Sequence, residues 1–407
     1  MARAILLALL LLQEQAKPDP ELEAKRTKIA ATLEAIRGAK FDKTVPVRAG
    51  ERKEYGTNAL ENAKLLYGDD LAVAGRALKS LGLISGRIRL DLAIPTLALA
   101  AKVQAFYRNG ELVIVDRESP DDELLYKLAL GLADQRFKVR EGAAKLGTNF
   151  DAQMAWAAMQ HGEADMCKQL MWAGKKTSDK MPDEHLKKLA AGADKWERED
   201  SKWASAVAPR IFIRAGDFIW RRGGIYIETI RQQDGMEGVD KAWAAMPTTE
   251  QILHPEKRGK DLPAIVDTRT LEDAMAAGKW KRVYKTTLGE LGTAILLETH
   301  LKDEIEKASP GWGGDTLCTF EDEAGKPLTV WATSWDSADD AAEFHAAIQR
   351  VSNAFATEKT TFNYALRRGT NVALVIGSTK AIEDALLDGL WKCTVKRGDK
   401  EEKFGKE

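Results

Sequence analysis

The segment Leu124–Phe137, LLYKLALGLADQRF, has helical spacing and is apolar on nearly every face of the predicted helix. A helix that is apolar all round is stable only when other elements bury it. The chain therefore needs a large core. Its 407 residues are enough for one, and this length favours two lobes over one compact unit.

The pattern up to residue 285 is mainly helical. A charged helix and linker are expected over residues 17–44, and a largely helical domain over residues 45–285. Within that domain, alternation about Asn109-Gly110 predicts a short β-hairpin, and Asp151–Trp172 reads as a second long helix. Ser119 and the acidic residues after it are expected to cap the helix that contains LLYKLALGLADQRF. The spacing Thr248 to Gln251 predicts a capping box.

The pattern changes after residue 285. Two segments, TLCTFEDEAGKPLTVWATSW and FNYALRRGTNVALVIGS, alternate apolar and polar residues about a glycine, which is typical of hairpins. Helical segments separate them, so residues 286–395 are predicted to form an α+β lobe with an antiparallel sheet. The charged segment 396–407 is expected to be a disordered tail. The fold class predicted for the whole chain is α+β.

The N-terminus has the features of an export signal. Arg3 precedes an unbroken apolar run from Ala4 to Leu12, and polar residues follow up to Ala16. This run is too short to span a bilayer, and it has no polar face for an amphipathic helix. Residues 1–16 are therefore expected to be a signal peptide that directs the protein to the periplasm or the exterior. No later segment is apolar enough to span a membrane.

Charge and cysteine content exclude three kinds of protein or site. The 61 basic and 62 acidic side chains nearly cancel, so the basic footprint of a nucleic-acid binder is missing. Cys167, Cys318 and Cys393 form no CxxC pair, which excludes a disulfide scaffold and a thiolate zinc site. One disulfide between Cys318 and Cys393 and three free thiols are both compatible with this spacing.

Six local patterns occur in one order: AFYRNGELVIVD, LADQRF, DAQMAWAAMQHGEAD, PTTEQILHPEK, GWGGD and WDSADDAAEF. Together they resemble a family of mostly uncharacterised, exported, zincin-like metallopeptidases of prokaryotes. The resemblance covers roughly residues 45 to 350, and PTTEQILHPEK is its most specific part. It implies a zincin-like scaffold in which an H-E-x-x-H helix binds zinc. A carboxylate on the next helix would complete that zinc site.

The residues that such a zinc site needs are absent from the matching positions. Aligned on Asp134-Gln135, Tyr126 and Leu130 occupy the places of the two histidines, and Lys127 that of the glutamate. Tyrosine and leucine supply no imidazole nitrogen, and a lysine cation is no general base. The resemblance therefore implies a degenerate site with no resident cofactor.

Three residues of the second helix remain as metal candidates, namely His161, Glu163 and Asp165. If they bind zinc, the protein is an active metal-dependent hydrolase with a non-standard site. A different outcome is that Lys127 takes the place of the metal and pairs with Glu163, because a buried carboxylate without a counter-ion is costly. Equally, both charges reach solvent separately.

His254 and Trp312 are candidates for the wall of a binding cleft. His254 is favoured as a residue that fixes its loop by hydrogen bonding, and Trp312 as a packed indole within a glycine-rich turn. The Arg221-Arg222-Gly223-Gly224 segment is expected to be a solvated helix end, with a site for a carboxylate as the alternative.

The sequence thus favours an exported pseudo-peptidase whose cleft, between the helices of Leu124 and Asp151, binds an extended polypeptide. An active metal-dependent hydrolase and a purely structural envelope component are the alternatives.

Overall fold

The computed structural model describes residues 19–182, 184–193, 208–301, 305–355 and 361–406. The expected leader, residues 1–16, lies outside the described residues. Residues 184–193 are helical. In the parts of the chain that the structure describes, no helix combines the length and apolarity needed to cross a membrane.

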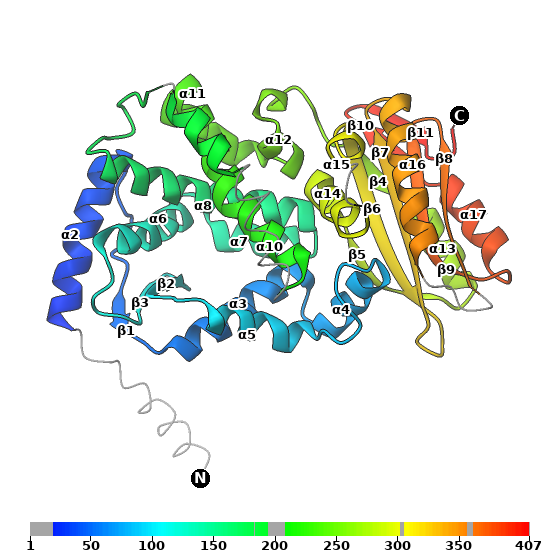
Figure 1. Ribbon diagram of the computed structural model, residues 1–407, viewed down its shortest axis with the longest axis horizontal. Coiled ribbons are helices and arrows are strands. Elements are labelled where there is room, and N and C mark those ends of the chain that lie inside the picture. Colours follow the sequence, from blue (N-terminus) through cyan, green and yellow to red (C-terminus); the bar gives the residue numbers. More distant parts are fainter. Residues whose placement is uncertain (1–18, 183, 194–207, 302–304, 356–360, 407) are drawn as a thin grey trace, which may run out of the picture.

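The N-terminal part of the chain is a helical lobe (Figure 1). Its helices are, in order, α2 (Pro20–Arg37), α3 (Arg52–Tyr67), α4 (Leu71–Ser80), α5 (Leu90–Ala100), α6 (Asp121–Phe137), α7 (Val139–Leu146), α8 (Phe150–Trp172), α10 (Arg210–Asp217), the π-helical turn η1 (Phe218–Arg222), α11 (Gly223–Ala245), α12 (Thr249–Leu253) and the 3₁₀ turn η2 (Pro255–Lys257). A small sheet of β1 (Val47–Ala49), β2 (Ala105–Arg108) and β3 (Glu111–Ile114) adjoins them, and β2 and β3 form the predicted hairpin.

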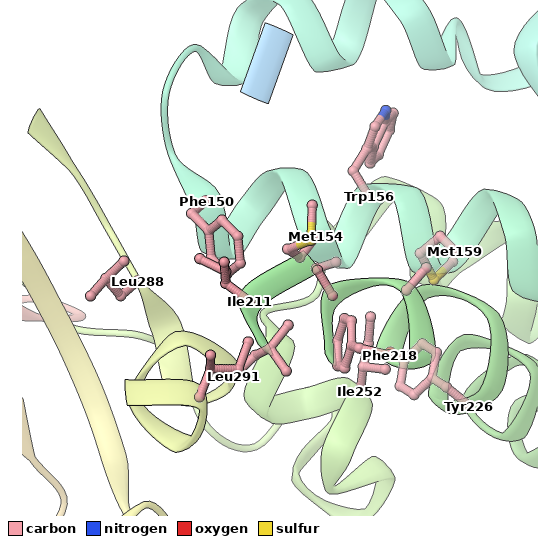
Figure 2. Close-up of a cluster of buried hydrophobic side chains, with 14 of the residues drawn as sticks. Phe150, Met154, Trp156, Met159, Ile211, Phe218, Tyr226, Ile252, Leu288 and Leu291 are labelled. Atoms are coloured by element: carbon pink, nitrogen blue, oxygen red, sulfur yellow. The ribbon is translucent and has the colours of Figure 1, made fainter. Parts of the chain in front are cut away.

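Helix α8 lies at the centre of this lobe and packs against α6, α11 and η1. Figure 2 shows part of the resulting core, where Met154 and Met159 of α8 face Ile211, Phe218 and Tyr226. Helix α6 is buried along its middle, as its all-round apolar character requires. The capping box from Thr248 to Gln251 is present at the start of α12.

The C-terminal lobe contains a five-stranded antiparallel sheet in the order β5-β6-β7-β9-β8. Alternate residues of β7 face opposite sides of it: Trp331 packs toward the helical lobe with α14 and α16, and Val330 toward α13 and α17. The elements are β4 (Ile265–Asp267), α13 (Arg269–Ala277), β5 (Lys281–Thr286), α14 (Gly289–His300), α15 (Ile305–Ala308), β6 (Trp312–Glu321), β7 (Pro327–Trp335), α16 (Ala338–Ala354), β8 (Phe362–Arg368), β9 (Asn371–Ser378), α17 (Glu383–Trp391), β10 (Thr394–Arg397) and β11 (Lys400–Lys403).

The chain is therefore an α+β protein, with both hairpins of the C-terminal lobe as predicted. Its boundaries differ from the prediction. The C-terminal lobe begins before residue 286, because β5 pairs with β6 and Val266 of β4 belongs to the same core as Val330.

The predicted disordered tail is wrong for residues 396–406. Strands β10 and β11 pair with each other, β10 also pairs with β4, and the Phe404 side chain is fully buried. Charged residues conceal this hairpin in the sequence, since Val395 and Phe404 are its only buried apolar anchors.

Two smaller expectations also change. Ser119 makes no cap for α6: its hydroxyl donates to the carbonyl of Gln104 at 3.2 Å, and Pro120 is the N-cap. The three cysteines are free, buried thiols, so Cys318 and Cys393 form no disulfide.

Candidate binding cavity

The helical lobe encloses a cavity of about 470 Å³ between α3, α6, α8 and the α10–η1 segment. Its walls are mostly aromatic and aliphatic, and include Tyr55, Phe106, Leu130, Trp156, Phe212 and Trp220. Trp220, on the π-helical turn, remains 56% exposed, so the cavity wall extends to the protein surface there. The volume of the cavity and its mostly apolar lining match those of ordinary ligand pockets.

Two of the three α6 positions that the resemblance matches to a zinc helix line the cavity. Lys127 and Leu130 of α6 line it together with His161 of α8. The Tyr126 hydroxyl lies 2.6 Å from Nδ1 of His161, which joins the two helices by a hydrogen bond. Lys127 pairs with Glu123 one turn earlier, at 3.0 Å.

Both partners of the Tyr126–His161 bond are held neutral. Burial lowers the pKa of His161 to about 3, and the nearby Lys127 ammonium acts in the same direction. Burial also raises the pKa of Tyr126 well above its usual value. The bond therefore joins a neutral phenol to a neutral imidazole, and it engages Nδ1, a nitrogen that could otherwise bind a metal ion.

Glu163 lies elsewhere. It accepts from Nε of Arg37 at 2.6 Å and from the indole of Trp243 at 2.8 Å, and all three side chains are buried. Arg37 pairs in addition with Asp240. The predicted pair between Lys127 and Glu163 is therefore wrong: a different cation, from α2, neutralises the carboxylate.

The three residual metal candidates do not converge. Successive helical residues turn by about 100°, so Glu163 points about 200° away from His161. Asp165 instead accepts from Gln169 and lies 3.8 Å from the Lys168 ammonium. These donors fit no shared metal ion.

Only one group of three possible metal ligands occurs among the residues that the structure describes: Glu250, Asp261 and Asp336. The Lys257 ammonium lies among them, at 2.6, 3.2 and 3.3 Å respectively. Although burial opposes it, pairing with Glu250 raises the pKa of Lys257. A lysine cation thus occupies the place between these carboxylates.

His254 and Trp312 both lie outside the large cavity. His254 bonds to Glu290 at 2.9 Å, a contact that raises the pKa of the imidazole, so it fixes the loop after α12 as favoured from the sequence. The Trp312 indole is buried and donates to Asp315 at 2.9 Å within the GWGGD segment. Trp312 lines a second, smaller cavity between the lobes.

The Arg221-Arg222-Gly223-Gly224 segment is no helix end. The π-helical turn continues directly into α11 there. A Cβ atom on Gly223 would lie 2.3 Å from the carbonyl oxygen of Ala158, and one on Gly162 would lie 2.3 Å from that of Gly223. The two glycines allow α8 and α11 to touch backbone to backbone.

Sequence reasoning missed Asn58, which the structure places in the cavity wall. Only 6% of this residue is exposed, yet its amide makes no hydrogen bond to any residue that the structure describes. No sequence signal marks it, because asparagine in a charged helix is ordinary.

Similarity to known proteins is partial. Residues 279–386 match the family described as a domain of unknown function (DUF8575). The match covers the five-stranded sheet with α14 and α16, which is less than half of the chain. A proline–tRNA ligase of Salinibacter ruber (strain DSM 13855 / M31) is 26% identical over 144 residues, which are 33% of this chain. The chain spans about a quarter (26%) of the ligase. No solved structure matches.

Proposed function

We propose that the protein is a pseudo-peptidase: a zincin-like scaffold that binds an extended, apolar polypeptide in the α6–α8 cavity and does not hydrolyse it. The site of action proposed is outside the cytoplasm. The observation that supports a polypeptide ligand is the position of the Asn58 side chain in the cavity wall. Its amide lines the cavity and bonds to no described residue, and an asparagine side chain offers the donor and acceptor that complement one peptide group.

The surroundings of Asn58 favour apolar side chains. The rings of Tyr55 and Phe106 also line the cavity and contact each other at a tilt, with their centroids 5.4 Å apart. Helix α5 contributes Ile94 to the wall, and its Leu92 and Leu99 side chains are 57% and 39% exposed. Such exposed apolar surface beside a cavity is typical of a binding groove.

We propose that the protein does not hydrolyse its ligand, because the side chains that could bind a metal ion or activate water are already engaged. Tyr126 engages His161, and Arg37 with Trp243 engages Glu163, so no pair of these groups is available to activate a water molecule. Lys127 supplies a cation at the position where the resemblance expects a base.

Binding is tested with a library of fluorescent, unstructured peptides and the full chain, measured by anisotropy. We expect apolar peptides to bind and charged ones not to. Asn58→Leu is expected to weaken binding at least tenfold without unfolding the free protein, because the amide that is removed bonds to no described residue.

Trp220→Ala is expected to weaken binding of the same peptides. Trp172→Ala is the matched control, since Trp172 is similarly exposed and does not line the cavity. Unchanged binding in both Asn58→Leu and Trp220→Ala would reject the proposal. So would stoichiometric zinc that is lost in His161→Ala or Glu163→Ala, together with peptide cleavage.

A further inference from the structure

A second cavity, of about 270 Å³, lies at the junction of the two lobes. The start of α8, the loop before α12, and strands β4 and β6 form it. Among its lining residues are Asp151, Trp156, Met246, Ile265, Trp312 and Asp315. The volume is just below the usual range for small-molecule pockets, which suits a single side chain.

The two carboxylates in this cavity differ in their hydrogen bonds. Asp315 is satisfied by four donors: the backbone N–H groups of Leu288 and Gly289 and the indoles of Trp312 and Trp331, all within 2.8–3.0 Å. Its role is to join α14 to β6 and β7.

Asp151 is only half satisfied. Its Oδ1 accepts from both the backbone N–H and the hydroxyl of Thr249. Its Oδ2 has no hydrogen-bond partner in the described parts of the chain, although only 4% of the residue is exposed. Gly289 is required beside it, because φ is +73° there and a Cβ atom would lie 2.1 Å from Oδ1.

The described lining of the cavity supplies no cation to this carboxylate. Among the described residues that line the cavity there is no lysine, arginine or histidine. A buried carboxylate without a counter-ion is costly. A positively charged ligand would remove that cost, and this gain would contribute to its binding free energy.

The other walls suit an aliphatic chain that ends in a cation. The indoles of Trp156 and Trp312 line the cavity, and aromatic rings attract cations. Ile265 and Met246 are 65% and 46% exposed, and they offer apolar surface for methylene groups.

We propose that this junction cavity binds an alkylammonium or guanidinium group, with Asp151 as its counter-ion. The group belongs to a lysine or arginine side chain of a polypeptide or to a free amine. This site shares only the Trp156 side chain with the α6–α8 cavity among the lining residues, and the inference does not rest on the proposed function.

The test is calorimetric titration of the full chain with four probes: N-acetyl-lysine methylamide, N-acetyl-arginine methylamide, 1,4-diaminobutane and the neutral N-acetyl-norleucine methylamide. At least one cationic probe is expected to bind tenfold or more tightly than norleucine. A preference for the capped amino acids assigns a polypeptide source, and a preference for the diamine assigns a free amine. Equal binding by norleucine would overturn the proposal.

Asp151→Asn is expected to remove the preference for the cation, and Asp165→Asn, an acid of α8 outside the cavity, to keep it. Ala152→Leu is the second variant, because it fills the cavity from α8 and leaves the bonds between Asp151 and Thr249 intact. It is expected to abolish binding of the cationic probes. Retained binding in folded Asp151→Asn or Ala152→Leu protein would overturn the proposal, whatever the peptide library shows for the other cavity.

Discussion

The hydrogen bond between Tyr126 and His161 gives a prediction at the scale of single residues. Tyr126→Phe leaves Nδ1 of a largely buried imidazole without its hydrogen-bond partner, which costs about 1–3 kcal/mol in the free energy of unfolding. Denaturant unfolding of both proteins measures this loss.

Tyr226→Phe is the matched control. The Tyr226 side chain is buried in the same lobe, but its hydroxyl has no partner among the described residues. Removing that hydroxyl is expected to be neutral or stabilising. Equal losses for the two variants would show that the Tyr126–His161 bond does not stabilise the fold.

Asp151 gives a prediction about pH. Burial raises its pKa to about 7, and the nearby Asp315 and Glu290 carboxylates add to this, while the bonds from Thr249 oppose it. The folded state therefore keeps a proton that the unfolded state releases above pH 4. Stability from this group is present at pH 4 and is lost as pH rises to 7, by up to about 4 kcal/mol.

The measurement is denaturant unfolding at pH 5 and pH 8 for the wild type and Asp151→Asn. The amide carries no titrating proton, so the variant should gain stability relative to the wild type between the two pH values. An identical pH dependence of the two proteins would contradict an elevated pKa.

Only part of the candidate site was predictable at this scale. The sequence indicated Tyr126, Lys127 and Leu130 because a helical motif fixes their spacing, and the structure places Lys127 and Leu130 in a cavity wall. It did not indicate that Arg37 pairs with Glu163, because 126 residues separate them and neither charge is unusual in its own segment.

At the scale of elements, the contact between α8 and α11 depends on Gly162 and Gly223. Gly162→Ala forces a methyl group against the carbonyl of Gly223, so a loss of about 1–3 kcal/mol in unfolding free energy is expected. Gly192→Ala is the control, since no atom of the described residues lies within 4 Å of its Cβ position, and alanine there should be neutral or stabilising. Thermal unfolding measures the stability of both variants. An unchanged stability of Gly162→Ala would contradict the close contact between α8 and α11.

The C-terminal hairpin gives a second prediction for an element. Phe404 is fully buried and stacks on Trp391 with ring centroids 5.9 Å apart. Phe404→Ala is therefore expected to cost about 3–5 kcal/mol, as for other buried aromatic residues. A disordered tail would instead give no change in denaturant unfolding.

Elements with a strong local signal were predicted well, and those that depend on distant partners were not. The hairpins about Gly325 and Gly369 are confirmed because glycine at positive φ and flanking alternation are local features. Strand β10 was missed because it exists by pairing with β4, more than 120 residues earlier. The π-helical turn has no sequence signature and follows from packing against α8.

At the scale of the whole molecule, Lys257 connects the two lobes. It joins Glu250 and Asp261 of the helical part to Asp336 at the end of β7, and Asp336 also pairs with Arg397 of β10. Lys257→Met leaves carboxylates without their cation and is expected to cost about 3 kcal/mol.

Because the three carboxylates offer ligand atoms within 4.8 Å of one another, millimolar calcium is expected to restore part of the stability of Lys257→Met and none to the wild type. Thermal unfolding with and without calcium tests this. Full stability of the variant without calcium would show that Lys257 does not hold the lobes together.

The two-lobe α+β organisation was predictable from the change of periodicity after residue 285. The junction between the lobes was not. Asp151, Thr249 and Asp315 belong to three segments noted in the sequence, but only the folded chain shows that they surround one polar centre.

The π-helical turn Phe218–Arg222 has one further consequence. A π turn holds one residue more than an α turn, so it is equivalent to a single-residue insertion in a continuous helix. Deleting one residue there would restore the α repeat and rotate every following side chain by about 100° relative to α10. Gly223 would no longer face Ala158, and Trp220 would leave the cavity. The extra residue of the π-helical turn thus sets both the position of Trp220 in the cavity wall and the packing of α11 on α8.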